Sequence, residues 1–60
     1  MLTFRILTNH GTIDFANSYT LAARKYKQYC LDCVRGYSDF VRLVSVNSDG
    51  SETELASLRK

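Results

Sequence analysis

Apolar residues recur at helical spacing between Tyr19 and Tyr37, and this pattern constrains the fold more than any other feature of the sequence. The apolar stripe consists of Tyr19, Ala22, Ala23, Tyr26, Tyr29, Cys30, Cys33, Val34 and Tyr37. Asn17 or Ser18 is suited to cap the start, because either side chain can accept a hydrogen bond from the first turn. Gly36 can adopt the left-handed conformation that ends a helix. The spacing therefore predicts one amphipathic helix that extends to about Arg35, with the stripe buried.

The segments on both sides of this helix carry the two-residue period of β-strands. The predicted strands span residues 2–8, 12–15, 39–46 and 51–57. Turn residues separate them in pairs, with Asn9-His10-Gly11 in the first hairpin and Asn47-Ser48-Asp49-Gly50 in the second. On the last strand, alternation places Thr53 and Leu55 on one face and Glu52, Glu54 and Ala56 on the other.

These elements predict one small α+β domain over residues 1–60. Its order is ββαββ, or βαββ if the second strand is too short to count. The crossover from the second strand to the third makes these two parallel in direction, so the first strand fits between them. We expect the strand order 2-1-3-4, with the helix packed on one face of an antiparallel sheet and the other face open.

Composition narrows the class of protein. A chain that is 45% hydrophobic and 12% aromatic argues against intrinsic disorder. No apolar run approaches the roughly 20 residues that cross a bilayer, and the start resembles no signal peptide. Two cysteines are too few for a disulfide framework. We expect a cytoplasmic protein, without a membrane partner and without a cofactor.

No catalytic or metal-binding constellation stands out. Cys30 and Cys33 form a CxxC, but they lie near the end of the predicted helix and on its apolar stripe, which favours core packing over redox or zinc chemistry. His10 stands in a turn, and no known spacing links it to Ser18, Asp14 or Cys30 as a catalytic partner. We expect no enzymatic activity, no catalytic residues and no metal ligands.

The charges predict a dipolar molecule, although the net charge is only +2. Arg24, Lys27, Gln28 and Arg35 lie on the exposed side of the helix and form a candidate nucleic-acid surface. Asp49, Glu52 and Glu54 are interpreted as a solvated acidic hairpin that discourages edge pairing. Exposed rings for base stacking are not expected, because the four tyrosines lie on the stripe.

The open face of the sheet is the other candidate surface. The third strand is apolar on both faces, whereas a half-solvated strand should alternate. Exposed apolar area marks contact surfaces; a bulge that hides it, or scattered surface residues, is the alternative. The candidate partner-binding residues are Arg5, Leu7, Phe40, Arg42 and Val44. A homodimer through the same face would bury that area.

In general character the chain resembles the short orphan proteins encoded by bacteriophages and prophages. The residues that carry this resemblance are the helical segment Ala22-Ala23-Arg24-Lys25-Tyr26 and the segment from Val44 to Ser51. The resemblance implies binding to a host or phage protein that is inhibited or redirected. We therefore expect a non-enzymatic protein-binding module, monomeric or homodimeric, with nucleic-acid binding as the alternative.

Overall fold

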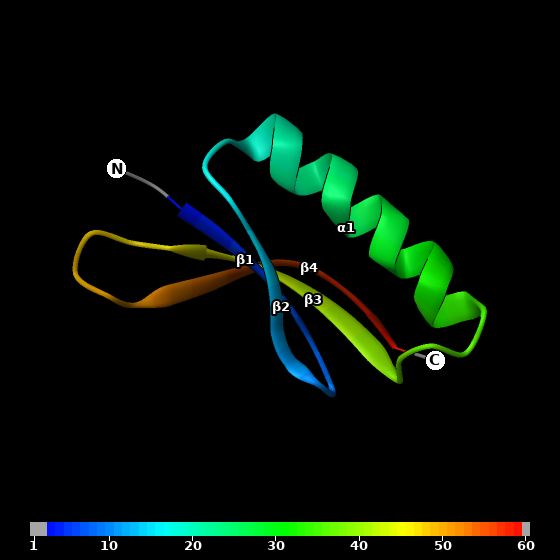
Figure 1. Ribbon diagram of the computed structural model, residues 1–60. Helices are drawn as coiled ribbons and strands as arrows, with labels where there is room; N and C mark the ends of the chain where they lie inside the picture. The colour runs from blue at the N-terminus through cyan, green and yellow to red at the C-terminus, as the bar shows by residue number, and fades with distance from the viewer. Residues whose placement is uncertain (1–2, 60) are drawn as a thin grey trace.

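The computed structural model describes residues 3–59, which form a four-stranded antiparallel sheet with one helix packed on it (Figure 1). The elements are β1 (Thr3–Thr8), β2 (Gly11–Ala16), α1 (Tyr19–Val34), β3 (Phe40–Val46) and β4 (Glu52–Arg59). The spatial order is β2-β1-β3-β4. The predicted α+β class, the ββαββ order and the strand order are confirmed. Leu2, the predicted start of the first strand, lies outside the described residues.

Both ends of α1 are fixed by local hydrogen bonds. The Ser18 Oγ accepts from the Leu21 amide at 3.2 Å, so Ser18 is the N-cap. At the other end Gly36 has a φ of 98°. Its amide donates to the Cys33 carbonyl, and the Tyr37 amide donates to the Asp32 carbonyl, which is the Schellman arrangement. Among residues 3–59, no helix combines the length and the apolar character needed to cross a membrane.

The core lies between α1 and the adjoining face of the sheet. Its buried members are Phe4, Ile6, Ala16, Ala22, Cys33, Val41 and Leu43. The helix packs on β1, β2 and β3. Alternation along β1 and β3 then directs Arg5, Leu7, Arg42 and Val44 to the opposite face, which no helix or strand of residues 3–59 covers (Figure 1).

The predicted apolar stripe is wider than the buried face of the helix. Tyr19, Val34 and Tyr37 are 62%, 70% and 71% exposed, so the prediction that these three are buried is wrong. Val34 lies about 120° around the helix from Ala22, beyond the arc that a sheet can cover. Tyr37 follows the chain reversal at Gly36, where helical spacing no longer applies. Tyr19 packs edge-on against Phe4 and remains largely exposed.

A β-bulge changes the faces of β4. Leu43 pairs with Ala56, whereas the next residue, Val44, pairs with Glu54, so Leu55 is the extra residue. Ala56 therefore faces the helix and packs against the core, while Glu54 faces the open side. The prediction that Glu54 and Ala56 share a face is wrong, because alternation holds only where no residue is inserted.

Candidate functional site

The structure places the five predicted sheet residues on the face away from α1. Arg5 lies opposite Val44, and Leu7 lies opposite Arg42, in the pairing of β1 with β3. Phe40 begins β3 on the same face. At that end of the sheet it lines a cavity of about 350 Å³ together with Arg42, Glu54, Ser57, Leu58 and Arg59. Four of the five residues thus form two neighbouring cross-strand pairs.

This open face does not expose the apolar area that the sequence predicted for Val44. Val44 is only 1% exposed, although none of the described helices and strands covers it. Arg5 binds Glu52 at 2.5 Å and Arg42 binds Glu54 at 2.7 Å, and these cross-strand ion pairs flank Val44. Glu52 and Glu54 are exposed, as predicted for a solvated acidic hairpin, but both are bound in ion pairs. Their carboxylates neutralise the two arginines and help to cover the valine.

Phe15 is an open-face residue that the sequence did not single out. It is 60% exposed and lies opposite Arg5, whose guanidinium carbon is 6.0 Å from the centre of the ring. A cation–π contact of this kind contributes about 0.5–1 kcal/mol at an exposed site. Only the pairing register brings Phe15 beside Arg5, so periodicity within the short second strand could not reveal it.

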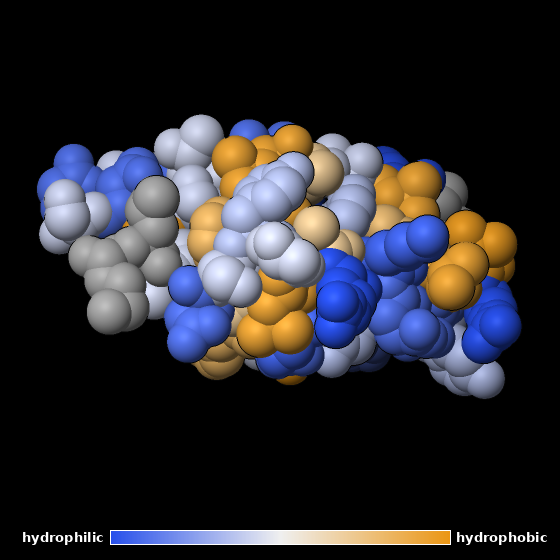
Figure 2. Space-filling model, turned by 90° about the horizontal axis from the view of Figure 1, so that it is seen from above, coloured by the Kyte–Doolittle hydropathy of each residue, from blue (hydrophilic) through white to orange (hydrophobic). Residues whose placement is uncertain are grey.

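The outer face of α1 has a different character. Arg24, Lys27, Gln28 and Arg35 are exposed there, as predicted from the helical period. No ion pair joins these cations to an acid within residues 3–59. Leu31 and Val34 lie among them at helical spacing and are 47% and 70% exposed. Figure 2 shows apolar side chains beside strongly hydrophilic ones toward the C-terminal end of this face.

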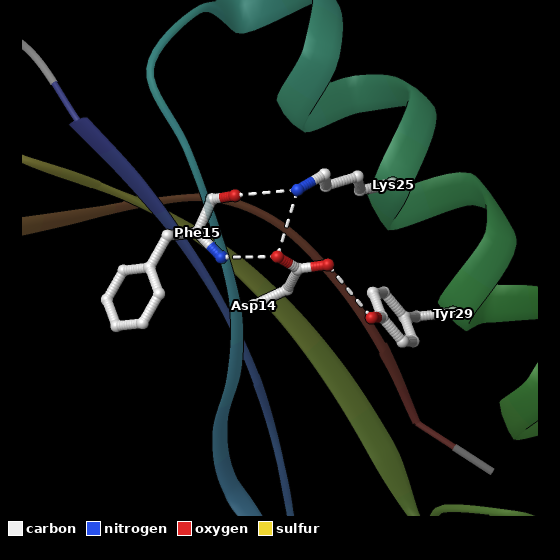
Figure 3. A network of polar contacts seen from close by, with 4 residues as sticks. All are labelled: Asp14, Phe15, Lys25 and Tyr29. Carbon is white, nitrogen blue, oxygen red and sulfur yellow. Dashed lines mark hydrogen bonds and ion pairs between the residues drawn. The ribbon is translucent and has the colours of Figure 1, made fainter.

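The Asp14 carboxylate links β2 to the helix through a polar network (Figure 3). One oxygen accepts from the Phe15 amide at 2.8 Å and from the Lys25 ammonium at 2.9 Å, and the other accepts from the Tyr29 hydroxyl at 2.9 Å. Lys25 first, and then the Phe15 amide, hold the pKa of Asp14 below its usual value of 3.8. The hydrogen bond to Asp14 in turn raises the pKa of Tyr29.

We expect this network to make the protein less stable in acid. A carboxyl whose pKa is lower in the folded state contributes its stability above the unfolded pKa and loses it as the pH falls through the folded pKa. Asp14→Asn should therefore cost about 1–2 kcal/mol at pH 7 and progressively less below pH 3.8. Urea unfolding followed by circular dichroism between pH 7 and pH 2 measures the difference.

Tyr29→Phe is the matched control, since it removes one of the three hydrogen bonds and leaves the Asp14–Lys25 pair in place. Its effect at pH 7 should be smaller than that of Asp14→Asn. Parallel loss of stability by the wild type and Asp14→Asn over the acid range would contradict the role assigned to this carboxylate.

Among residues 3–59, His10 makes no hydrogen bond to Ser18, Asp14 or Cys30. Its Nε2 lies 3.3 Å from the Tyr37 carbonyl oxygen, at the end of the helix opposite to Ser18. Asp14 is already bound by Lys25 and Tyr29. The histidine lines a cavity of about 160 Å³ with Asp32, Tyr29, Tyr37 and three others (Thr8, Ile13 and Ser38), smaller than the roughly 300 Å³ of a typical ligand site.

The cysteines contribute to packing in this structure. Cys33 is fully buried in the core, and Cys30 packs against it half-buried; both are free thiols. Burial, with Cys30 nearby, raises the pKa of the Tyr26 phenol to about 12. Over the described part of the chain, no three His, Cys, Asp or Glu side chains group closely enough to hold a metal ion.

Comparison of this chain with models of known protein families, with curated proteins and with solved structures found no match. The structure defines two candidate surfaces: the open sheet face (Arg5, Leu7, Phe15, Phe40, Arg42 and Val44) and the outer helix face (Arg24, Lys27, Gln28, Leu31, Val34 and Arg35).

Proposed function

We propose that the protein is a non-enzymatic protein-binding module whose interface is the outer helix face. One observation carries this proposal: two exposed apolar side chains, Leu31 and Val34, lie among exposed cations that have no acidic partner within residues 3–59. An apolar centre with charged surroundings is the usual arrangement of a protein-binding surface. Exposed leucine and valine side chains gain free energy when a partner removes them from water.

The open sheet face supports the same function less well. Its two central arginines already bind glutamates of β4, and Val44 beneath them has almost no exposed area left to bury. A partner that bound this face would either break these ion pairs, at a cost in free energy, or leave them in place and bury little apolar area. Phe15 is the residue through which such a partner could still bind, since 60% of it is exposed.

The positive charge of the outer helix face favours binding to an acidic partner. Lys27 and Arg35 each lie four residues from Leu31, on either side of it, and Arg24 extends the positive charge by one turn. An acidic protein surface with an apolar side chain at its centre would match both features. A host or phage protein with such a surface, inhibited or redirected by this module, is the partner class that we propose.

The test is a capture experiment with matched variants. Tagged protein is incubated with nuclease-treated bacterial lysate, and bound proteins are identified by mass spectrometry. We expect a stoichiometric acidic protein that binds the wild type and Phe15→Ser but not Leu31→Ser/Val34→Ser or Arg24→Glu/Lys27→Glu. Loss of the partner with Phe15→Ser and its retention by both helix variants would contradict the proposal and favour the sheet face.

Nucleic-acid binding through Arg24, Lys27, Gln28 and Arg35 is the second candidate. The observation that favours it is the exposure of Tyr19 and Tyr37, because exposed rings are available for base stacking. Fluorescence anisotropy with labelled single-stranded and duplex oligonucleotides distinguishes the two functions. Nucleic-acid binding should weaken steeply with salt and survive Leu31→Ser/Val34→Ser, whereas it should be lost in Arg24→Glu/Lys27→Glu.

A further inference from the structure

The two edges of the sheet differ in how their backbone groups are used. At the β2 edge, the Phe15 amide donates to the Asp14 carboxylate at 2.8 Å, and the Phe15 carbonyl accepts from the Lys25 ammonium at 2.9 Å (Figure 3). Side chains thus bind both backbone groups of this residue, and the Lys25 side chain lies across the edge. An added strand would have to displace them, so pairing is opposed at this point of the β2 edge.

The β4 edge is open by the same criterion. No hydrogen bond among residues 3–59 joins a side chain to a backbone group of β4. The helix packs on the other three strands. With eight residues, β4 is also the longest strand of the sheet. Unpaired amides and carbonyls on a long edge are a template for another strand.

Charges on an edge strand ordinarily oppose pairing, but on β4 they favour one particular partner. Glu52 lies on the open face opposite Val46, and Arg59 lies on the same face opposite Phe40. In a regular strand, residues seven apart point to opposite faces. The bulge at Leu55 adds one residue between them, and so returns Glu52 and Arg59 to one face.

A second β4, placed antiparallel, is complementary to the first in this register. Glu52 of each copy lies opposite Arg59 of the other, Glu54 opposite Ser57, Thr53 opposite Leu58, and Leu55 opposite Ala56. The register of β4 with β3 puts the members of the first two pairs on the open face and those of the third on the helix side. Opposite charges directly across two strands stabilise pairing, and like charges oppose it.

We infer that β4 pairs with β4 of a second copy across a two-fold axis between Leu55 and Ala56. The product is one continuous eight-stranded sheet with both helices on the same face. Arg59, which has no ion pair within the described residues, gains Glu52 of the other copy. The dimer leaves the outer helix face of each copy free, so it does not depend on the proposed function.

Sedimentation equilibrium over a range of protein concentrations tests this inference. We expect the wild type to dimerise, and Arg59→Glu to raise the dissociation constant about tenfold or more, because two attractive pairs become repulsive. Glu52→Arg should weaken the dimer for the same reason, although it also removes the ion pair of Glu52 with Arg5. Arg35→Glu is the matched control, since it makes the same charge change on the exposed side of the helix and should leave dimerisation unchanged.

A mixture of the two weakened variants tests the proposed pairing of position 52 with position 59 directly. In a heterodimer of Arg59→Glu with Glu52→Arg, the glutamate introduced at position 59 lies opposite the arginine introduced at position 52, and the native Glu52 of one copy lies opposite the native Arg59 of the other. The mixture should therefore dimerise at concentrations at which each variant alone is largely monomeric. This rescue cannot arise from misfolding of either variant. A wild type that stays monomeric up to about 1 mM, corresponding to a binding free energy weaker than about −4.1 kcal/mol, would overturn the inference. A mixture that fails to dimerise would overturn it as well.

Discussion

Replacing Val44 with aspartate is expected to unfold the protein at neutral pH. Val44 is 1% exposed, and its cross-strand neighbours are Arg5 and Glu54. A carboxylate at this position would lose water and lie beside Glu54, while the nearest arginines are already bound to glutamates. A buried charge without its own partner costs about 3 kcal/mol or more, comparable with the total stability of so small a domain.

Val34→Asp is the matched control for this prediction, because it makes the same substitution at a position that is 70% exposed. It should cost at most about 1 kcal/mol, chiefly from a negative charge in the last turn of α1. Urea unfolding monitored by far-UV circular dichroism measures both variants. Equal stability of the two would show that the ion pairs do not close over Val44.

The second large effect is expected from Ile6→Ala. Ile6 is fully buried on the helix side of the central strand β1, where it pairs with Leu43 and Asp14. Removing three carbons from a packed core leaves a cavity and typically costs 2–5 kcal/mol, about half or more of the stability of a domain of this size. The thermal midpoint and the urea midpoint should both fall accordingly.

Leu31→Ala serves as the control, since it also removes three side-chain carbons, but from the outer helix face, where Leu31 is 47% exposed. Its cost should stay below about 1 kcal/mol. If Ile6→Ala were no more destabilising than Leu31→Ala, the core would not lie between α1 and the sheet. The pair therefore tests which side of β1 is buried.

These stability effects determine which substitutions can test binding by each surface. Because Val44 is buried, Val44→Asp cannot test binding by the open sheet face; loss of binding would report unfolding. Phe15→Ser is the informative change there, because Phe15 is exposed and its backbone groups remain bound by Asp14 and Lys25. On the helix, Leu31 and Val34 can be replaced without disturbing the core.

The sequence by itself determined the elements and their order. Helical period, a capping serine and Gly36 define α1, and two-residue alternation with turn residues defines the four strands. Once a single helix separates two hairpins, few strand orders remain, and the order β2-β1-β3-β4 follows from short connections. These features are encoded by neighbours in the chain, which is why periodicity reveals them.

Only the tertiary structure decided which surfaces are available. The ion pair of Arg5 with Glu52 joins residues 47 apart, and the bulge at Leu55 reverses the faces of half of β4. Val44 is buried because side chains from neighbouring strands cover it, whereas Val34 is exposed because it lies on the side of the helix that the sheet does not reach. In both cases burial depends on neighbours that are distant in the sequence. Such contacts depend on register, and one inserted residue changes register without altering the local pattern from which a strand is predicted.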